Sequence, residues 1–361
     1  MRRRPTIVLG ASGLVGQRMQ QRLTNHPWFE LKAIGGRPER SQQSLHEIPW
    51  RLEQQRPEVP DIPILDTSSE SFIEELEKLN IEVAFSCLPS EVAEHIETTL
   101  AQAGIAVFSN ASFHRRKQGI PLVIPDVNAG HFTDFSTSKG PHACGTNCTL
   151  VPMAAPLAAL RDFEISKVEM RSEQALSGAG WRLLYDEQAM TGELNPAIPG
   201  EAEKVHEEFL HVFGTHHDSI VHPSDIEVNV KCQRVARKDG HQVFVKATFA
   251  KPLSFDKVIS AFNSQRFNET VSQCPSAPVR PLHVVESIDV EEHLWSDGVT
   301  FSDSPLPNEN LQTGMAVVVG DVEIHNQYTL SFSAYSHNTI RGAAGGTMWL
   351  AELAVVEGRI L

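Results

Sequence analysis

Residues 5–23, PTIVLGASGLVGQRMQQRL, decide how the chain folds at its N-terminal end. An apolar run is followed by three spaced glycines and then by a helical pattern, which predicts a buried strand, a tight turn and a helix. Glycines permit such a turn and let the backbone approach a pyrophosphate, while the helix start supplies N–H donors. The alternative is a tight turn that binds no ligand. We expect a dinucleotide to bind here through Gly10, Ser12, Gly13, Leu14 and Val15.

A second predicted strand, over residues 30–35, ends close to Arg37, Arg40 and Ser41. An NAD site usually carries an acidic residue at this place, which binds the ribose 2′-hydroxyl. Cationic residues suit a 2′-phosphate instead, so we predict NADP as the cofactor. The alternative is that both arginines are solvated charges of a surface loop.

The hydrophobic pattern changes character near residue 150 of the 361. Before it, short apolar strands alternate with helical segments, which predicts a parallel sheet with helices on both faces. After it, few helices separate longer alternating segments, which favours a mostly antiparallel sheet. We therefore predict an α/β protein: an N-terminal parallel-sheet domain and a second, α+β domain. The strands expected in the second domain are 162–175, 225–235, 241–250, 281–289, 315–324 and 328–335.

The composition excludes several classes of protein. The net charge of −14 disfavours nucleic acid and anionic membranes as partners, although a local basic pocket for a small anion stays possible. No run of 18 apolar residues exists that would predict a membrane span. Five scattered cysteines are too few for a disulfide framework, so we expect reduced thiols and a cytoplasmic location.

Cys148 is the candidate nucleophile, because it precedes the apolar helical run LVPMAAPLAAL. A cysteine at a helix start can have a lowered pKa. Taken alone, a cysteine in this place is more often a small buried apolar residue. The spacing of His142, Cys144 and Cys148 fits no common zinc signature, and we expect no metal site.

Arg234 and His241 flank the turn signal Asp239-Gly240, which predicts a two-residue hairpin in which Arg234 pairs with Val245. Both residues continue the buried faces of their strands, and in such a ladder they would lie about 13 Å apart. A cation and an imidazole at these positions favour a site for a small anionic substrate between them. The alternative is a hairpin end whose polar residues simply meet water.

A series of motifs runs nearly from end to end of the chain: GASGLVG (10–16), SCLPS (86–90), SNASFHRR (109–116), VIPDVN (123–128), TNC (146–148), QALSGAG (174–180), PGEAEK (199–204), RVARKDGH (234–241) and SHNTIRGAAGG (336–346). In this order the motifs resemble the aspartate-semialdehyde dehydrogenase family in its archaeal and fungal branch. The resemblance implies an NADP-binding Rossmann domain of residues 1–147 plus 338–361, to which the C-terminal helix returns. It implies a catalytic and oligomerisation domain of residues 148–337, and a homodimer or homotetramer.

The resemblance also implies a reaction: NADPH-dependent reduction of L-aspartyl 4-phosphate to L-aspartate 4-semialdehyde through a cysteine thioester, with release of inorganic phosphate. By the same resemblance Cys148 is the nucleophile, His241 the acid/base, and Gln174 the residue that orients the intermediate. Four residues would bind the substrate: Arg234 and Glu201 its carboxylate and amino groups, Arg115 and Lys204 its phosphate. Four more would lie beside the cofactor: Ser177, Gly178, Asn338 and Gly342.

Some stretches depart from the family pattern. Gly145-Thr146 stands where the family has Asn-Pro, and no apolar strand is evident before it. Trp181-Arg182-Leu183 replaces an aromatic-Pro-Gly run, Glu173 precedes Gln174, and Arg237-Lys238 makes the predicted turn basic. A paralogue that reduces another acyl phosphate, or an acyl-CoA such as malonyl-CoA, therefore stays open. A non-enzymatic nucleotide sensor is disfavoured because both Cys148 and His241 are present.

Overall fold

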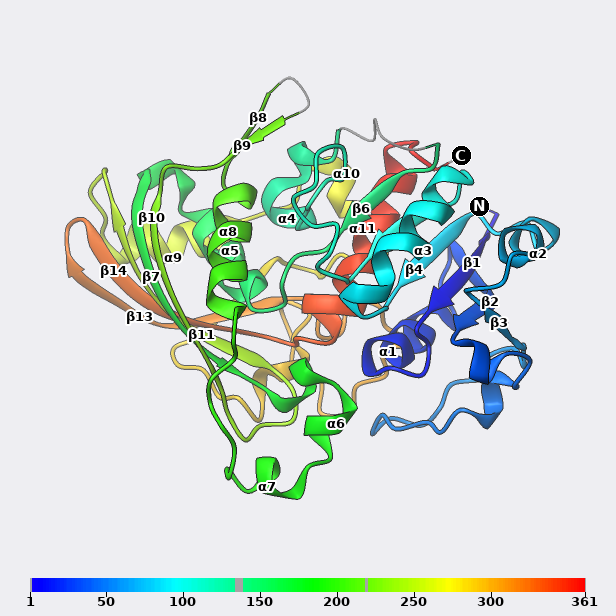
Figure 1. The fold of residues 1–361 in the computed structure, drawn as a ribbon. Coiled ribbons are helices and arrows are strands. Elements are labelled where there is room, and N and C mark those ends of the chain that lie inside the picture. The colour runs from blue at the N-terminus through cyan, green and yellow to red at the C-terminus, as the bar shows by residue number, and fades with distance from the viewer. Residues whose placement is uncertain (1, 134–138, 218–219, 361) are drawn as a thin grey trace.

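The computed structural model describes residues 2–133, 139–217 and 220–360, and it contains two six-stranded sheets (Figure 1). All neighbouring strands of the first sheet are parallel, in the order β3-β2-β1-β4-β5-β6. This is the strand order of a dinucleotide-binding Rossmann sheet, so the prediction for the N-terminal part is confirmed. The strands are β1 (Arg4–Leu9), β2 (Phe29–Gly36), β3 (Ile64–Asp66), β4 (Val83–Ser86), β5 (Ala106–Ser109) and β6 (His142–Cys144).

Helices cover both faces of this sheet because successive side chains of each strand point to opposite faces. Val8 of β1 belongs to a core with α1 (Leu14–Leu23) and α11 (Gly345–Val356). Its neighbours Ile7 and Leu9 belong to another core, with α2 (Phe72–Lys78) and α3 (Ser90–Gln102). Helix α11, red in Figure 1, lies between the two sheets. The C-terminal helix thus returns to the first domain, as expected.

The second sheet is mixed, in the order β10-β7-β11-β14-β13-β12. Its three central pairings are antiparallel, and β10 and β12 at the edges pair in parallel. Helices α5 (Leu150–Ala159), α8 (Glu201–Val212) and α9 (Phe255–Ser264) pack against it. The strands are β7 (Ile165–Gln174), β10 (Glu227–Arg234), β11 (His241–Phe249), β12 (Leu282–Val284), β13 (Val317–Asn326) and β14 (Thr329–Ser336).

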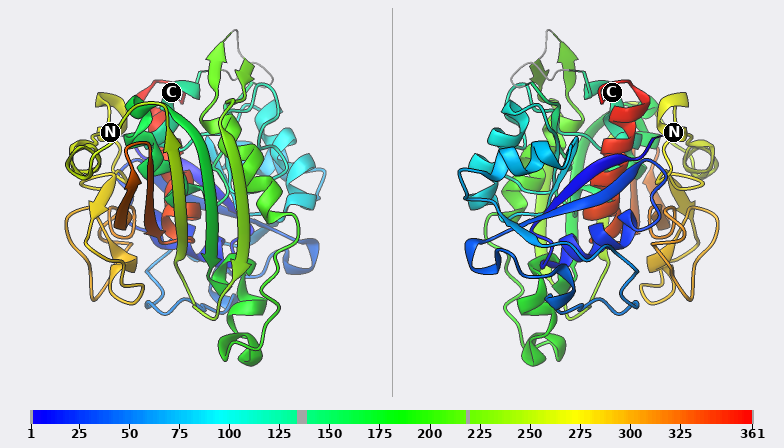
Figure 2. Two further views of the ribbon diagram at one scale, coloured as in Figure 1. Left: turned by 90° about the vertical axis from the view of Figure 1, so that its left-hand side faces the viewer. Right: turned by 90° about the vertical axis from the view of Figure 1, so that its right-hand side faces the viewer.

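The other face of the second sheet is turned outward. Figure 2, left, shows its strands toward the viewer with no described helix in front of them. Polar residues such as Glu169, Arg171 and Lys246 line this face together with Phe244.

In the described part of the chain, no helix is both long and apolar enough to span a membrane. The remaining elements are α4 (Pro125–Asn128), α6 (Trp181–Leu184), α7 (Glu187–Met190), β8 (Thr215–His217), β9 (Ile220–His222) and α10 (Glu269–Ser272).

The predicted hairpin between β10 and β11 is wrong, because β7 lies between these two strands. Arg234 is paired with Gln174, and His241 with Ser336. The chain does turn at Gly240, which has a φ of 90°. However, residues 235–240, which connect β10 to β11, run beside the segment that follows β7. There the N–H groups of Leu176 and Ser177 donate to the carbonyls of residues 237 and 238. The prediction of which side chains of these strands face the core is confirmed, since Val228 and His241 are both buried.

The sequence also gave no sign of β3 and β6, which are only three residues long. β6 occupies the stretch before Cys148 in which no apolar strand was evident. It pairs with β5 on one side. On the other side Cys144 forms a bridge to Leu122, in which its N–H donates to the carbonyl of Pro121 and its carbonyl accepts from the N–H of Val123. His142 and Cys144 at its two ends are both buried.

Candidate active site

Cys148 lies in the turn between β6 and α5, where two contacts hold it in place. The side-chain oxygen of Asn147 accepts a hydrogen bond of 2.8 Å from the N–H of Thr149, just before α5 begins. A Cβ atom on Gly342 would lie 2.6 Å from the Cβ of Cys148, so the chain ahead of α11 packs directly against the cysteine. The Cys148 side chain is partly exposed. It is therefore held rigidly and is still accessible.

The charges of three predicted substrate-binding residues act on the pKa of the Cys148 thiol. Burial, with a smaller contribution from the carboxylate of Glu201, raises the pKa of this thiol to about 12, although Arg115 and Arg234 act in the opposite direction. The expectation of a lowered pKa at the helix start is therefore not met, because desolvation outweighs the two cations. An anionic group bound between Arg115, Arg234 and Cys148 would be attracted by both guanidinium groups.

A buried carboxylate that the sequence analysis missed connects these parts. Glu208, on the inner face of α8, accepts hydrogen bonds from Nη1 of Arg115 at 2.9 Å and from the N–H of Asn147 at 2.6 Å. The side chain of Asn147 in turn donates to Glu201 at 2.8 Å. The sequence does contain a signal for this residue. The buried face of α8 repeats at helical spacing through Val205, Glu208, Phe209 and Val212, so Glu208 stands at a position where an apolar residue is expected.

Arg234 and His241 meet at the loop after β7. A Cβ on Gly178 would lie 2.9 Å from Nη1 of Arg234 and 3.1 Å from Nε2 of His241, so the two tips are far closer than the predicted ladder allowed. Nδ1 of His241 accepts a 3.1 Å hydrogen bond from the N–H of Ala175. A neutral ring therefore carries its proton on Nε2, which is buried and has no hydrogen-bond partner among the described residues.

The charge state of His241 follows from its surroundings. Burial, together with the nearby cations of Arg234 and Arg237, lowers its pKa to about 3. The free imidazole is thus neutral near pH 7 and presents an N–H donor rather than a base. Gln174, at the buried end of β7, lies beside Arg234 in the sheet. Lys204 is exposed on α8, one turn after Glu201 and therefore on the same side of the helix.

The glycine-rich turn borders a cavity of about 440 Å³. Gly10 has a φ of +74°, and a Cβ there would lie 2.6 Å from the carbonyl oxygen of Cys87, so only glycine fits. Leu14 and Val15 are the first two residues of α1, whose N–H groups are available to an anion. Ser41 instead donates its N–H to Pro38. The predicted cofactor residues among those lining this cavity are Gly10, Ser12, Gly13, Arg37 and Arg40.

Two side chains join the glycine-rich turn and the C-terminal segment to the second domain. Trp181 donates from Nε1 to the carbonyl of Ser12 at 2.9 Å, a contact that the sequence analysis missed although it noted the unusual Trp181. Asn338 donates to Oγ of Ser177 at 2.8 Å and accepts from the N–H of Gly240 at 2.8 Å. The predicted cofactor residues Ser177 and Asn338 are therefore in direct contact.

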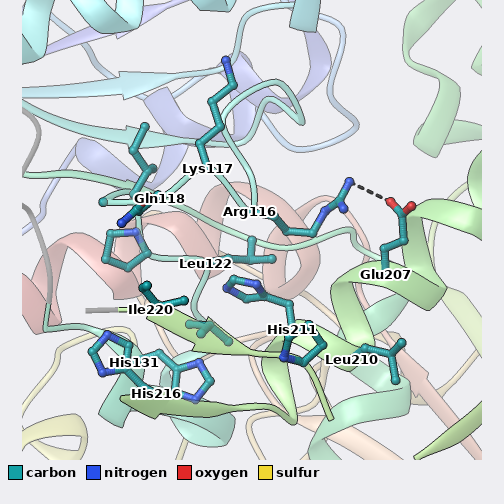
Figure 3. Close-up of a pocket in the computed structure, with 15 residues that line it drawn as sticks. Arg116, Lys117, Gln118, Leu122, His131, Glu207, Leu210, His211, His216 and Ile220 are labelled. Carbon is teal, nitrogen blue, oxygen red and sulfur yellow. Dashed lines mark ion pairs between the residues drawn. The ribbon is translucent and has the colours of Figure 1, made fainter. Parts of the chain in front are cut away.

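A different cavity, of about 400 Å³, lies beneath β8 and β9 (Figure 3). Its lining includes the imidazoles of His131, His211 and His216, and none of the predicted site residues. Burial lowers the pKa of His211 to about 4, so its ring is neutral near pH 7. The ring centre of His131 lies 6.4 Å from that of His211 and 6.0 Å from that of His216. These rings pack against one another and do not converge on a single point.

Comparison with known proteins agrees with this geometry. Residues 6–135 match the semialdehyde dehydrogenase NAD-binding domain family, and residues 156–341 match the semialdehyde dehydrogenase dimerisation domain family. The chain is 32% identical over 357 residues to aspartate-semialdehyde dehydrogenase of Archaeoglobus fulgidus, covering 97% of each protein. It is 30% identical over 375 residues to that of Saccharomyces cerevisiae, covering 98% of each.

A solved structure supports the same conclusion. The crystal structure of aspartate semialdehyde dehydrogenase with NADP from Candida albicans matches 99% of this chain and 100% of that chain, with a TM-score of 0.80 and 27% identity. The match extends over both sheets and the site between them. Sequence, fold and site agree that the chain belongs to the aspartate-semialdehyde dehydrogenase family, whose members are oxidoreductases.

Proposed function

We propose that this enzyme is an NADP-dependent phosphorylating aspartate-semialdehyde dehydrogenase, which reduces L-aspartyl 4-phosphate to L-aspartate 4-semialdehyde. The observation that carries the proposal is the position of Cys148 within the fields of Arg115, Arg234 and Glu201. Two cations and one carboxylate match a substrate that carries a phosphate, a carboxylate and an ammonium group.

In the proposed reaction, the Cys148 thiolate attacks the acyl carbon of the acyl phosphate. The bond from this carbon to the phosphate oxygen breaks, inorganic phosphate leaves, and a thioester on Cys148 remains. The nicotinamide, held by Ser177, Gly178, Asn338 and Gly342, would supply the hydride to the thioester carbon. The tetrahedral alkoxide that results collapses with breaking of the C–S bond, which gives the aldehyde and the Cys148 thiolate and needs no further proton acceptor.

His241 acts in this proposal through Nε2. Its N–H donates to the oxygen that becomes negative when the acyl carbon is attacked, since Nδ1 is held by the N–H of Ala175. Arg234 lies beside this imidazole and lowers its pKa. A substrate carboxylate bound to Arg234 would offset that cation and raise the pKa of His241. A ring that has released the N–H of Ala175 could then act as the acid/base that exchanges a proton with the tetrahedral intermediate. Gln174 orients the same intermediate.

The remaining substrate contacts follow from charge. Arg115 uses Nη1 and Nη2 for Glu208 and the carbonyl of Asn110, and its Nε has no partner among the described residues. We assign Nε to the phosphate, with the ammonium of Lys204 approaching from solvent. Glu201 and Arg234 would bind the amino and carboxylate groups.

The cofactor proposal rests on the cavity at the glycine-rich turn. The close approach of Gly10 to the carbonyl of Cys87 leaves the backbone open to a pyrophosphate, and Arg37 and Arg40 line the same cavity. Both arginines are exposed and can turn toward a 2′-phosphate. Gly178, Ser177, Asn338 and Gly342 would lie beside the nicotinamide. The Candida albicans relative was solved with NADP.

We propose a homodimer or homotetramer in the cytoplasm, with residues 1–147 plus 338–361 as the NADP-binding domain. Residues 148–337 would form the catalytic and oligomerisation domain. The match of residues 156–341 to a dimerisation family supports the outward face of the second sheet as the contact between copies. Inorganic phosphate and the small-molecule substrate are the other partners.

The test is NADPH formation from L-aspartate 4-semialdehyde and NADP, with and without inorganic phosphate. We expect turnover that requires phosphate and that Cys148→Ser abolishes. Phosphate-independent turnover, or turnover of malonyl-CoA in place of the aspartyl substrate, would overturn the proposal in favour of a paralogue with a different acyl donor.

A further inference from the structure

Three ionisable side chains that the proposed mechanism does not use meet in the interior of the first domain. They come from three separate segments: Glu97 from α3, His114 from the stretch after β5, and His142 from β6. Their exposed fractions are 0%, 4% and 3%. One ligand atom from each lies within 4.8 Å of the corresponding atoms of the other two.

Three atoms of this cluster are buried without a hydrogen-bond partner among the described residues: Oε2 of Glu97, Nε2 of His142 and Nδ1 of His114. The Glu97 and His142 atoms lie 3.3 Å apart and still form no aligned hydrogen bond. Nε2 of His114 lies 3.8 Å from the same carboxylate oxygen. A buried charged oxygen and a buried imidazole nitrogen left unsatisfied are each costly, so the arrangement calls for an occupant between them.

The carboxylate is oriented for this occupant by its other oxygen. Oγ of Ser109 donates to Oε1 of Glu97 at 2.6 Å, and the N–H of Ala111 donates to the same hydroxyl at 3.0 Å. Such hydrogen bonds behind a carboxylate are the usual support of a metal ligand.

We propose that Glu97, His114 and His142 bind a divalent ion of the zinc class, with water at the fourth position. Zinc bonds of about 2.0–2.2 Å in a tetrahedral site place neighbouring ligand atoms about 3.3 Å apart, which is the separation of Oε2 and the His142 nitrogen. His114 Nε2 lies 3.3 Å from the carbonyl of Glu94 and would turn from it toward the ion. The sequence analysis missed this site because it looked for ligands at short spacings along the chain, whereas these three ligands come from different segments.

The ion would have a structural role beside the active site. His114 directly precedes Arg115, and β6 leads into the turn that carries Cys148. Binding all three ligands would tie α3, the stretch after β5 and β6 together. We therefore expect metal removal to lower thermal stability first, whether or not the enzyme uses aspartyl phosphate.

The experiment uses full-length protein without a histidine tag, purified without chelators or metal columns. Elemental analysis should find close to one zinc per chain, and much less in His142→Phe. His95→Ala, an exposed histidine on the same α3, should keep the metal. Protein stripped with dipicolinate should lose several degrees in Tm and recover them on addition of zinc.

Cobalt(II) gives a readout that needs no variant. Added to the stripped wild-type protein, it should produce the visible absorption of a tetrahedral site at one equivalent, and zinc should displace it. Wild-type protein that contains no metal, gives no cobalt spectrum and shows no change of Tm with zinc would overturn the proposal. His142 and Glu97 would then be a buried ion pair.

Discussion

Nη1 of Arg115 lies 2.9 Å from Oε1 of Glu208, in an ion pair whose side chains are only 10% and 3% exposed. The other oxygen of Glu208 binds the N–H of Asn147, the residue before the candidate nucleophile. One carboxylate therefore holds both the proposed phosphate-binding arginine and the turn that carries Cys148. Removing one partner of a buried pair leaves the other charge uncompensated.

We expect Glu208→Gln to lower the free energy of unfolding by about 3 kcal/mol, measured by urea denaturation. The KM for phosphate should rise as well, because Arg115 loses its fixed orientation. The matched control is Glu207→Gln, whose carboxylate pairs with Arg116 at 2.7 Å with side chains 40% and 50% exposed. An exposed pair contributes at most about 1 kcal/mol. Equal effects of the two substitutions would show that burial of Glu208 is immaterial.

Much of the fold could be predicted because its signals are local. The run from β1 through the glycine-rich turn to α1 specifies strand, turn and helix within twenty residues, and the alternation along β10 and β11 gave the correct buried faces. Strand pairing is not local. Nothing in residues 234–241 reveals that β7 lies between β10 and β11. The chain does turn at Asp239-Gly240, but the two strands that flank the turn are not paired with each other.

The candidate site could be proposed from the sequence where chemistry depends on residue type, and not where it depends on packing. Cys148, Arg234 and His241 became candidates because a thiol, a cation and an imidazole stand out against apolar patterns. Glu208 resembles any solvated helix carboxylate until α8 is seen to turn it inward. The pKa of Cys148 was expected to fall at a helix start, but the depth of the site, which only the fold determines, raises it.

Trp181 offers a test of how the second domain supports the glycine-rich turn. Trp181→Phe removes the donor to the carbonyl of Ser12 and keeps the ring. Loss of a hydrogen bond worth about 1 kcal/mol should raise the KM for NADP roughly fivefold. Tyr185→Phe is the control, since its hydroxyl binds the carbonyl of Arg51 outside the turn. An unchanged KM in Trp181→Phe would mean that the turn keeps its shape without this contact.

We expect cofactor preference to depend on Arg37 and Arg40, the two cations that line the cavity near the end of β2. Hydrogen bonds to a charged group contribute about 1.5–3 kcal/mol each, so Arg37→Gln combined with Arg40→Gln should raise the KM for NADP by roughly a hundredfold. The KM for NAD should change little. Arg3→Gln, which removes an exposed cation near Glu30, controls for the loss of surface charge. A double variant with unchanged preference would assign both arginines to solvent.

The reactivity of Cys148 should depend on pH in a way that follows from its neighbours. A thiol pKa of about 12 leaves very little thiolate near pH 7, and the thiolate fraction rises about tenfold per pH unit below the pKa. Alkylation by iodoacetamide should therefore accelerate about tenfold per unit from pH 7 to 9. His241, with a pKa of about 3, should add no inflection in this range. Mass spectrometry of the peptide that carries Cys148 separates it from Cys87 and Cys232, which are also partly exposed.

Two substitutions should shift this reactivity in opposite directions. Glu201→Gln removes a negative charge that raises the pKa of Cys148, so alkylation at pH 7 should become roughly three- to tenfold faster. Arg234→Gln removes a cation that lowers the same pKa, so alkylation should slow by a similar factor. Glu203→Gln, two residues further along α8 and exposed, should leave the rate unchanged. If both active-site variants moved the rate in the same direction, altered access to the thiol, and not its charge environment, would control the nucleophile.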